Sequence, residues 1–304
     1  ELKHPEPREV VIIHDAAWEG NGTGYHSIFK DGDLYRMYYT TYHFEVEPKQ
    51  LKVATRSFLC YAESDDGVHW RKPKLGLHEF EGSRNNNIVL APHDIGDLEV
   101  DTAHSAVFKD PNPVAPKEAR YKAVIRSKKR LGLLAFQSPD GLRWTPMRDQ
   151  PVITEGAFDS QNLAFWDPVR GEYRAYFRTY TAGVTNDEVG KPAGLRAIRT
   201  ITSDNFVDWK NAVDLTYVDS SEEHLYTNQI KPYHRAPHIF IGFPTRYVER
   251  GWSESMRTLP EPERRQWRAR AEERFGTALT EGLIMSSRDG ATFHRWNETF
   301  LRPG

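Results

Sequence analysis

The sequence predicts an all-β fold, a five-bladed β-propeller with four-stranded antiparallel blades and one short helical insertion. Three observations lead to this prediction. A Ser-x-Asp-Gly turn recurs along the 304 residues, a second pattern of paired strands interleaves with it, and no helices alternate with the strands as they do in parallel α/β folds. A β-sandwich also contains many short strands, but it does not require a repeating unit of four strands.

The turn motif gives the repeat its period. Its copies begin at Ser64, Ser138, Ser203 and Ser287, and the same later position in each is aromatic: Trp70, Trp144, Trp209 and Phe293. The Asp-Gly pair is typical of hairpin turns, although the third copy has Asn205-Phe206 in its place. An apolar segment precedes every copy, so each turn is expected to join two strands. We expect the three tryptophans to pack in comparable places between blades.

Each unit opens with a strand, a turn rich in Asp, Gly or Pro, and a second strand rich in aromatic and β-branched residues. These strand pairs occupy residues 28–39, 107–125, 165–177 and 230–243. A further short strand is expected to close each unit, at residues 87–90, 151–154, 212–217 and 298–301. The chain is therefore expected to form a single domain, 1–304, with units at about 16–90, 101–154, 159–217 and 223–303.

Residues 8–14 resemble the closing strands and precede the first unit, so we expect them to form the outer strand of a fifth blade. The three inner strands of that blade would have to follow Gly304. The fifth blade is therefore expected to be incomplete in this chain. A closed ring of four blades is the alternative, but it leaves the strand at 8–14 without a role.

One insertion, residues 248–276, interrupts the fourth unit. Pro262 suits the first turn of a helix, and strong helix formers follow it. Four Glu and five Arg residues alternate between positions 261 and 274, so we expect a solvent-exposed helix with ion pairs, on or beside the propeller face. The Glu residues argue against a basic helix that binds nucleic acid.

Composition narrows the classes of partner. The 41 basic and 43 acidic side chains give a net charge of −2, so no nucleic-acid partner is expected. No apolar run is long enough to span a membrane, and a single cysteine, Cys60, excludes a disulfide within the chain and a cysteine-based zinc site. The opening at Glu1 is consistent with removal of a signal peptide. A periplasmic or secreted location is favoured over a cytoplasmic one.

Acidic and polar residues gather just before the inner strand of each unit, where the loops of a propeller form its binding face. The expected catalytic carboxylates are Glu19, Asp101, Asp159 and Glu223, one from each unit. The expected substrate-binding residues are Trp18, Asn21, His26, His104, Gln161, Asn162, Trp166, His224, Tyr226, Asn228 and Arg246. Glycosidic-bond hydrolysis needs such a set, because one acid protonates the leaving oxygen while a second carboxylate attacks carbon or activates water.

Glu19 is the first candidate among the carboxylates. Gly20, Gly22 and Gly24 follow it, and glycines at a strand start suit a close approach of the backbone to a ligand. We expect Glu19→Gln to keep the fold and to lower turnover at least about a hundredfold. The histidines show no recognisable metal-ligand spacing, so no metal and no cofactor are expected, and a structural Ca²⁺ in the channel is not indicated.

The repeat, together with Trp18-Glu19-Gly20-Asn21, the segment 159–167 and Arg235-Ala236-Pro237-His238, resembles the furanosidase-like five-bladed propellers of glycoside hydrolase families 32 and 43. The resemblance covers essentially the whole chain and implies an acidic catalytic set that acts on terminal sugars. By position, Glu19 matches the first-blade base or nucleophile, Asp101 the second-blade carboxylate, and Asp159 or Glu223 the acid. The invertase signature Trp-Met-Asn-Asp-Pro-Asn-Gly is absent, so fructosidase activity is not implied.

The expected function is therefore a glycoside hydrolase that removes terminal sugars from plant or algal oligo- and polysaccharides. Two alternatives remain open. The turn motif is similar to the sialidase Asp-box, one residue shorter, and a sialidase-like hydrolase would need an arginine cluster, for which Arg178, Arg235 and Arg246 are candidates. A non-catalytic carbohydrate-binding propeller is the other alternative. The oligomeric state, the sugar and the linkage are not predicted.

Overall fold

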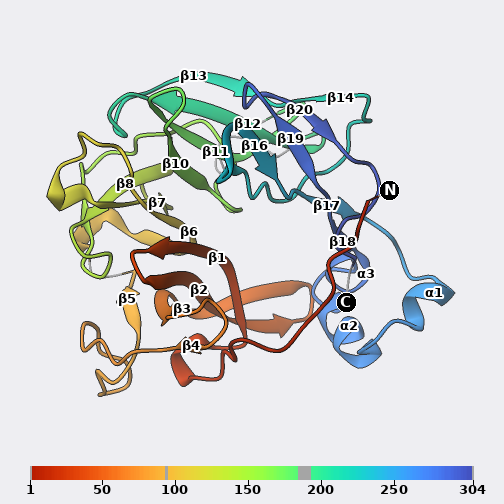
Figure 1. Cartoon of the computed structure of the whole chain (residues 1–304). Helices are drawn as coiled ribbons and strands as arrows, with labels where there is room; N and C mark the ends of the chain where they lie inside the picture. Colours follow the sequence, from red (N-terminus) through yellow and green to blue (C-terminus); the bar gives the residue numbers. More distant parts are fainter. Residues whose placement is uncertain (1, 93–94, 184–192, 303–304) are drawn as a thin grey trace.

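The computed structural model describes residues 2–92, 95–183 and 193–302. It shows an all-β propeller in which four antiparallel sheets, here called blades one to four, stand around a common centre (Figure 1). A cavity of about 760 Å³ along this centre is lined by residues of β1, β6, β10 and β15, the innermost strand of each blade. The helices are short and lie in one insertion and in single turns between strands.

Blades one to three are built in the same strand order, from the centre outward. Blade one contains β1 (Gly22–Asp31), β2 (Leu34–Glu47), β3 (Gln50–Ser64) and β4 (Trp70–Arg71), and β5 (Ile88–Leu90) also pairs with β3. Blade two contains β6 (Val100–Lys109), β7 (Tyr121–Ser127), β8 (Gly132–Ser138) and β9 (Thr145–Pro146). Blade three contains β10 (Leu163–Asp167), β11 (Glu172–Tyr180), β12 (Arg196–Ser203) and β13 (Trp209–Asp214).

Blade four carries the insertion. It contains β15 (Lys231–Tyr233), β16 (Ala236–Gly242), β19 (Met285–Ser287) and β20 (Thr292–Arg295), and β14 (Thr216–Val218) joins it in parallel to β20. Between β16 and β19 the chain forms a separate two-stranded sheet, β17 (Thr245–Val248) and β18 (Leu279–Gly282). Three short helices connect these two strands: α1 (Glu254–Arg257), α2 (Pro262–Ala269) and α3 (Arg274–Thr277).

The recurring turn owes its shape to hydrogen bonds within its own few residues. In blade one, the Ser64 hydroxyl accepts from the Gly67 amide (2.9 Å), and the Asp66 carboxylate accepts from the amides of Val68 and His69 (2.8 Å each). The copies at Ser138 and Ser287 repeat these bonds. The glycine has a positive φ in each copy (82°, 79° and 81°), which explains why glycine stands there.

The third copy keeps the turn without the glycine. Phe206 takes the glycine position at φ 69°, an unfavourable conformation for a bulky residue. Its side chain is fully buried and packs edge-on against Phe108 of blade two and Tyr173 of blade three. Burial of this ring between two blades offsets the backbone strain.

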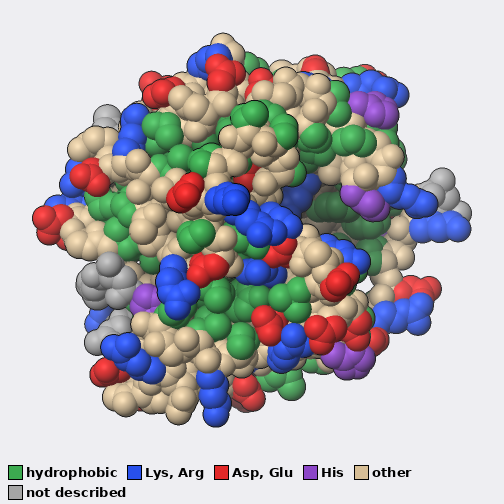
Figure 2. All heavy atoms as spheres, turned by 60° about the vertical axis from the view of Figure 1, so that its left-hand side comes forward, with side chains coloured by type: hydrophobic (Ala, Val, Ile, Leu, Met, Phe, Trp, Pro, Cys, Tyr) green, Lys and Arg blue, Asp and Glu red, His purple; other side chains and the backbone are tan. Residues whose placement is uncertain are grey.

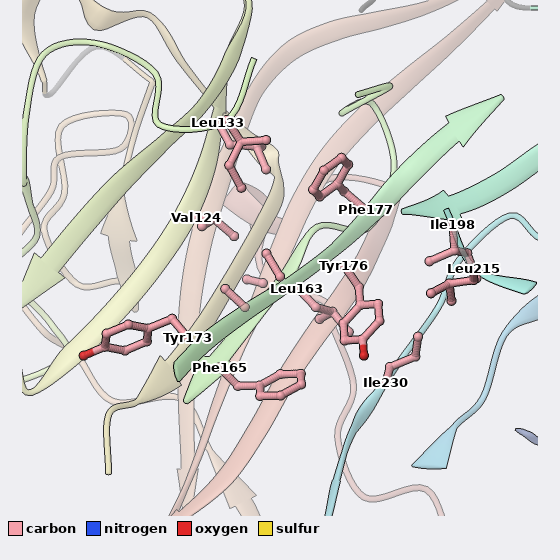
Figure 3. Packing of buried hydrophobic residues seen from close by; sticks show 14 of the residues in the cluster. Val124, Leu133, Leu163, Phe165, Tyr173, Tyr176, Phe177, Ile198, Leu215 and Ile230 are labelled. Carbon is pink, nitrogen blue, oxygen red and sulfur yellow. The ribbon is translucent and has the colours of Figure 1, made fainter. Parts of the chain in front are cut away.

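The hydrophobic core lies between neighbouring blades rather than along the central axis. Its largest cluster joins residues of blades two, three and four, ten of which are labelled in Figure 3. A second cluster joins blades one and two, and there Trp144 packs edge-on against Tyr38. Trp209 packs against Phe206 of its own turn. Trp70 differs, because it packs on a smaller cluster within blade one.

The strand expected at residues 8–14 is not formed. The N-terminal segment instead runs irregularly from blade four to blade one (Figure 1), and Nδ1 of His4 lies 3.1 Å from the Phe300 carbonyl. Among the described residues no strand pairs with this segment, so its backbone has no ladder in which to form a strand. Residues 151–154 and 298–301, expected to close their units, contribute single bridges at Ile153 and Leu301 rather than strands.

The surface carries mixed charge. Figure 2 shows the side of the molecule that lies at the left of Figure 1, and basic and acidic side chains are interspersed there with hydrophobic ones. Among the described residues, no helix is long and apolar enough to cross a membrane.

Candidate functional site

A cavity of about 610 Å³ opens where the loops and inner strands of the four blades meet the insertion. We call it the mouth cavity. Its wall combines aromatic rings with charged groups. Tyr25, Tyr42, Phe44, Tyr226, Tyr247 and Phe275 supply the rings, and His104, Asp159, Arg265, Arg268 and Arg274 supply the charged and titratable groups. Cavities of this size with convergent polar groups are the usual form of small-ligand sites.

His104 reaches the mouth cavity through an irregularity in β6. Asp101 pairs with Arg126 and Ala106 with Val124, so the residues between Asp101 and Ala106 bulge out of the ladder. The bulge turns His104 back toward Asp101, and Nδ1 of His104 lies 3.0 Å from Oδ2 of Asp101. Among the described residues, Nε2 of His104 has no hydrogen-bond partner.

The buried Asp101 holds this histidine in place as an anion. Burial alone would raise the pKa of Asp101, but the hydrogen bond from His104 and the charges of Lys128 and Arg126 outweigh burial and lower it. For His104, burial lowers the pKa, against the opposing pull of Asp101. The imidazole is therefore mainly neutral near pH 7, which leaves Nε2 free to accept a proton from a bound ligand or water.

Asp159 is the carboxylate that lines the mouth cavity. It precedes β10, and its side chain is 47% exposed. The guanidinium of Arg178, on β11 and only 5% exposed, forms an ion pair with it. Arg178 also lies over the ring of Tyr226, 5.8 Å from its centroid. This arrangement presents an ionised carboxylate to solvent at a fixed position beside an aromatic wall.

Tyr25 enters the cavity from a strained position on β1. Its φ is 50°, and the register of β1 against β2 shifts between Gly24 and Ser27. The ring lies 5.6 Å from that of His104. Burial, together with the neighbouring Tyr226, raises the pKa of Tyr25, so its hydroxyl stays protonated and can donate a hydrogen bond. Strained residues of this kind are frequent at ligand sites.

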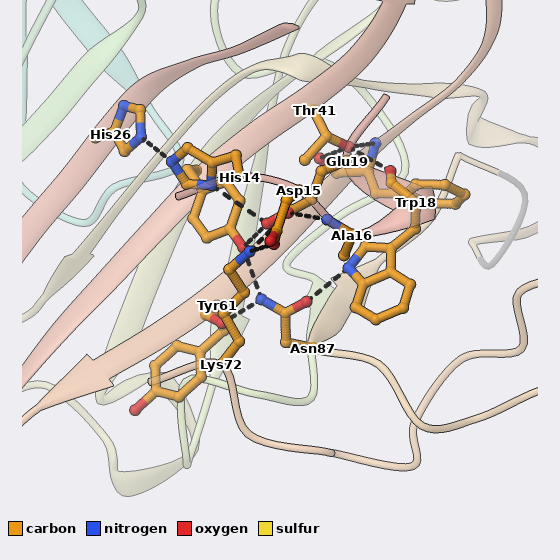
Figure 4. A network of polar contacts seen from close by, with 12 residues as sticks. His14, Asp15, Ala16, Trp18, Glu19, His26, Thr41, Tyr61, Lys72 and Asn87 are labelled. Carbon is orange, nitrogen blue, oxygen red and sulfur yellow. Dashed lines mark hydrogen bonds and ion pairs between the residues drawn. The ribbon is translucent and has the colours of Figure 1, made fainter. Parts of the chain in front are cut away.

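The structure does not bring Glu19 into the mouth cavity. Glu19 ends a single helical turn, Ala17–Glu19, and is fully buried. Figure 4 shows its surroundings, and each contact is short: Tyr39 Oη 2.5 Å, Lys72 Nζ 2.7 Å, the Ala16 amide 2.8 Å and His14 Nδ1 3.2 Å. Burial alone would raise the pKa of Glu19, but these hydrogen bonds lower it to about 2.

Tyr39, which donates to Glu19, belongs to a hydrophobic cluster of blade one that is separate from the cluster joining blades one and two. The neighbours of Glu19 in the chain, Asp15, Ala16 and Trp18, line a separate hollow of about 490 Å³. A carboxylate with four donors and no exposed surface has little capacity to contact a ligand. The glycines after it serve close packing instead: a Cβ on Gly20 would lie 2.5 Å from the Tyr42 carbonyl oxygen.

Glu223 also lies outside the mouth cavity. Its carboxylate contacts Arg246 (3.3 Å) and Arg295 (3.0 Å), and it borders a hollow of about 250 Å³. Arg246 in turn holds Glu281 at 2.6 Å. His224, predicted beside it, accepts a hydrogen bond from the Arg196 amide (3.0 Å). These residues form an ion-pair network of blade four and the β17–β18 sheet.

Of the remaining predicted binding residues, some make contacts within the protein and others line a cavity. Trp18 donates to Asn87 (2.7 Å), the Asn21 side chain binds the Phe44 backbone, and Trp166 packs on Tyr173. Gln161, Asn162 and Asn228 are buried, and their amides bridge neighbouring loops. His26 lines the central cavity, and Tyr226 lines the mouth cavity.

Several residues of the mouth cavity were not predicted from the sequence. Tyr42, Phe44 and Tyr247 lie on strands, where an aromatic residue gives no sign of whether it faces the core or a ligand. The insertion was expected to form a solvent-exposed helix with ion pairs, and it supplies Arg265, Arg268 and Arg274. Gly22 and Gly24 were the available signal for Tyr25, because a glycine within a strand often marks a bulge.

No group of three or more His, Cys, Asp or Glu residues that could hold a metal ion occurs in the described ranges. The mouth cavity holds a single carboxylate and one imidazole, and the carboxylate is paired with an arginine.

No protein-family model matches the chain, and neither does any curated protein sequence. Solved structures resemble it in fold. A thermostable family-43 glycoside hydrolase superposes with a TM-score of 0.56 at 10% identity, over 94% of this chain and 76% of that one. An N-acetylgalactosamine deacetylase from F. plautii, solved with blood group B trisaccharide, gives a TM-score of 0.55 at 13% identity, over 100% of this chain and 77% of that one.

A family 117 glycoside hydrolase from the marine bacterium Zobellia galactanivorans gives a TM-score of 0.50 at 11% identity, over 93% of this chain and 71% of that one. These structural neighbours confirm the propeller fold, and they include glycoside hydrolases of families 43 and 117, as the resemblance implied for family 43. At this identity the likeness concerns the fold.

Proposed function

We propose that the protein is a glycoside hydrolase that removes terminal sugars from plant or algal oligo- and polysaccharides. One observation carries the proposal: a single aromatic cavity at the mouth of the propeller holds a solvent-facing carboxylate, Asp159, and a histidine, His104, held by the buried Asp101. Tyrosine rings offer apolar faces with polar edges, which suits stacking against sugars. The propeller fold shared with carbohydrate-acting enzymes supports the same function.

The roles follow from the surroundings of each group. Asp159 is kept ionised by Arg178, so it suits attack on the anomeric carbon or activation of water. In its imidazolium form, which Asp101 stabilises, His104 donates the proton on Nε2 to the glycosidic oxygen and becomes neutral, and it regains a proton from solvent after each turnover. Asp101 is thus a positioning residue. Glu19 and Glu223, expected as catalytic residues, are saturated by other partners in this arrangement.

The test begins with a panel of aryl glycosides and oligosaccharides. Asp159→Asn and His104→Gln are each expected to lower kcat/KM at least about a hundredfold, while the exposed Asp65→Asn serves as a control that changes nothing. If His104 is the proton donor, its lowered pKa predicts that kcat/KM declines as pH rises through a midpoint below the ordinary histidine value of 6.5. Near-full activity of both variants would place the chemistry elsewhere.

A panel in which sugars bind but none is hydrolysed would favour the carbohydrate-binding propeller. Hydrolysis restricted to sialosides would favour the sialidase-like alternative. Isothermal titration calorimetry of the wild type against the same oligosaccharides separates binding from turnover, because it needs no reaction.

We further propose that the ring has five sectors, as the sequence predicts. Trp144 of blade two packs on Tyr38 of blade one, and Trp70 occupies the corresponding turn position of blade one. Trp70 lines a hollow that is bordered by the N-terminal segment, in which Val10 and Ile13 are 78% and 65% exposed, and by residues 72–74 and 85–87. In Figure 1 the β17–β18 sheet and the helices stand in the sector between blades four and one.

A crystal structure tests the number of sectors. A further sheet packed against Trp70 would support five sectors. Direct packing of blade four on blade one would support a ring of four.

A further inference from the structure

The mouth cavity carries more positive charge than its single carboxylate balances. Three arginines of the insertion line it, Arg265, Arg268 and Arg274, and the only carboxylate among its lining residues is Asp159. Asp159 is paired with Arg178, and Arg274 is paired with Glu272. In the part of the chain that the structure describes, neither Arg265 nor Arg268 has a carboxylate partner.

The two unpaired arginines belong to one face of α2. They are three positions apart, so their side chains leave the helix on the same side. Arg265 makes one hydrogen bond, from Nε to the Pro260 carbonyl (3.0 Å), and the guanidinium of Arg268 makes none among the described residues. Arg264, one position away, is turned outward and pairs with Glu261 at 3.3 Å. Arg264 is four positions before Arg268 and its charge also acts on Arg268, but its side chain is 59% exposed, is paired with Glu261 and does not line the cavity.

The position of α2 is set by packing on both sides. The amide of Lys49, at the tip of the β2–β3 hairpin, donates to the Arg270 carbonyl just after α2 (2.9 Å). On the other side, Gly276 of α3 lies so close that a Cβ there would be 2.2 Å from the Arg265 carbonyl oxygen. The arginines are therefore presented from a fixed wall of the cavity rather than from a free loop.

The surroundings of Arg268 disfavour an isolated charge. Burial lowers the pKa of Arg268, and the like charges of Arg264 and Arg265 lower it further, although an arginine remains protonated at any physiological pH. A half-buried cation beside a second cation is stabilised when an anion binds between them. Guanidinium groups bind carboxylates and sulfates through paired hydrogen bonds, which neutral hydroxyls cannot match.

We propose that the mouth cavity binds an anionic glycan, whose carboxylate or sulfate group contacts Arg268 and Arg265 while its sugar ring lies against the tyrosines. This deepens the proposed function by naming the substrate class, and it rests on that function only for the statement that the ligand is a glycan. Uronic acids and sulfated sugars share the required chemistry. Arg265 and Arg268 are then specificity-determining residues supplied by the insertion.

The experiment measures binding, so it does not depend on turnover. The probes are an oligogalacturonate with its carboxyl-reduced counterpart, and a sulfated galactan oligosaccharide with its desulfated counterpart, titrated calorimetrically into the whole chain. At least one anionic member is expected to bind about tenfold or more tightly than its neutral partner, as for a charge-assisted hydrogen-bond pair, and to weaken as salt is raised. Which pair shows the preference distinguishes carboxylate from sulfate.

Arg268→Gln and the double variant Arg265→Gln/Arg268→Gln are expected to lose that preference while keeping the affinity for the neutral counterpart. Arg264→Gln is the control on the same helix, because Arg264 is exposed, is paired with Glu261 and does not line the cavity, and this variant is expected to keep the preference. The proposal is overturned if neutral and anionic members bind equally, if no anionic member binds, or if Arg264→Gln has the same effect as Arg268→Gln. A failure of hydrolysis with the preference intact would overturn the proposed function alone.

Discussion

Residues of the same type have different fates in this fold because their partners differ. Asp159 and Glu19 are both acidic residues near the start of an inner strand. Asp159 has one cationic partner and stays half exposed, so it can meet a ligand. Glu19 accepts from four donors and has no exposed surface, so its charge stabilises the structure of blade one. Exposure, rather than acidity, separates a catalytic candidate from a structural anion.

The stability of the protein should depend on pH through Glu19. Its pKa is about 2 in the folded protein and 4.5 ordinarily, so its stabilising effect is present above about pH 4.5 and is lost as pH falls toward 2. The difference corresponds to about 3 kcal/mol. Chemical denaturation between pH 7 and 3 is expected to show wild type losing more stability than Glu19→Gln, which is less stable at pH 7.

Glu19→Gln is also expected to keep its turnover per folded molecule, in contrast to the expectation from sequence. Activity corrected for the folded fraction checks this. A hundredfold fall at full stability would return Glu19 to the catalytic set.

The insertion is the element that adds groups to the site while lying outside the hydrophobic clusters of the blades. Its helices α1 to α3 connect two strands that are already paired, Val248 with Leu279, and none of their residues belongs to the three hydrophobic clusters. Helix α2 has no buried residue. The ligand-binding residues of such an element can change while the structure of the blades stays the same.

Replacement of residues 249–278 by Asn-Gly tests this separation. Val248 and Leu279 would then flank a two-residue hairpin turn, which Asn-Gly favours. We expect the melting temperature to change by no more than about 5 °C, equivalent to 1–2 kcal/mol, and glycan binding to be lost. Loss of the β-sheet circular dichroism spectrum would show instead that the insertion supports the fold.

At the scale of the whole molecule, the blades are joined by the recurring turn. The turn of one blade reaches the second strand of the preceding blade: the Gly141 backbone meets Tyr38, and the Gly290 carbonyl accepts from the Tyr176 hydroxyl (2.8 Å). Arg36 adds a hydrogen bond to the Asp140 carbonyl (2.8 Å). The turn glycine therefore serves two purposes, a positive φ and a close approach between blades.

Gly141→Ala should destabilise the ring more than an ordinary substitution at positive φ. The new Cβ would lie 2.4 Å from Oη of the buried Tyr38, so the blades would have to move apart. We expect a loss of about 2–4 kcal/mol in urea denaturation, combining strain and overpacking. Gly32→Ala is the matched control: φ is 67° there and nothing lies within 4 Å, so only about 1 kcal/mol is expected. Equal losses in the free energy of unfolding would mean that the two blades can move apart without a further cost.

The sequence by itself determined the features that depend on neighbouring residues. The Ser-x-Asp-Gly turns are held by hydrogen bonds that span at most three residues, so their spacing revealed the propeller. The helix beginning at Pro262 followed from local preferences in the same way. The bulge that brings His104 to Asp101 also lies within a few residues, and both were among the predicted site residues.

Only the tertiary structure decided which of these residues share a cavity. Whether Glu19 is buried or free depends on Tyr39 and Lys72, which reach it from other strands and loops. Whether the segment 8–14 becomes a strand depends on a neighbouring strand, and none pairs with it among the described residues. The unpaired charge of Arg268 appears only when α2 is packed against the mouth. Pairing and desolvation are properties of the assembled surroundings, and a pattern along the chain does not contain them.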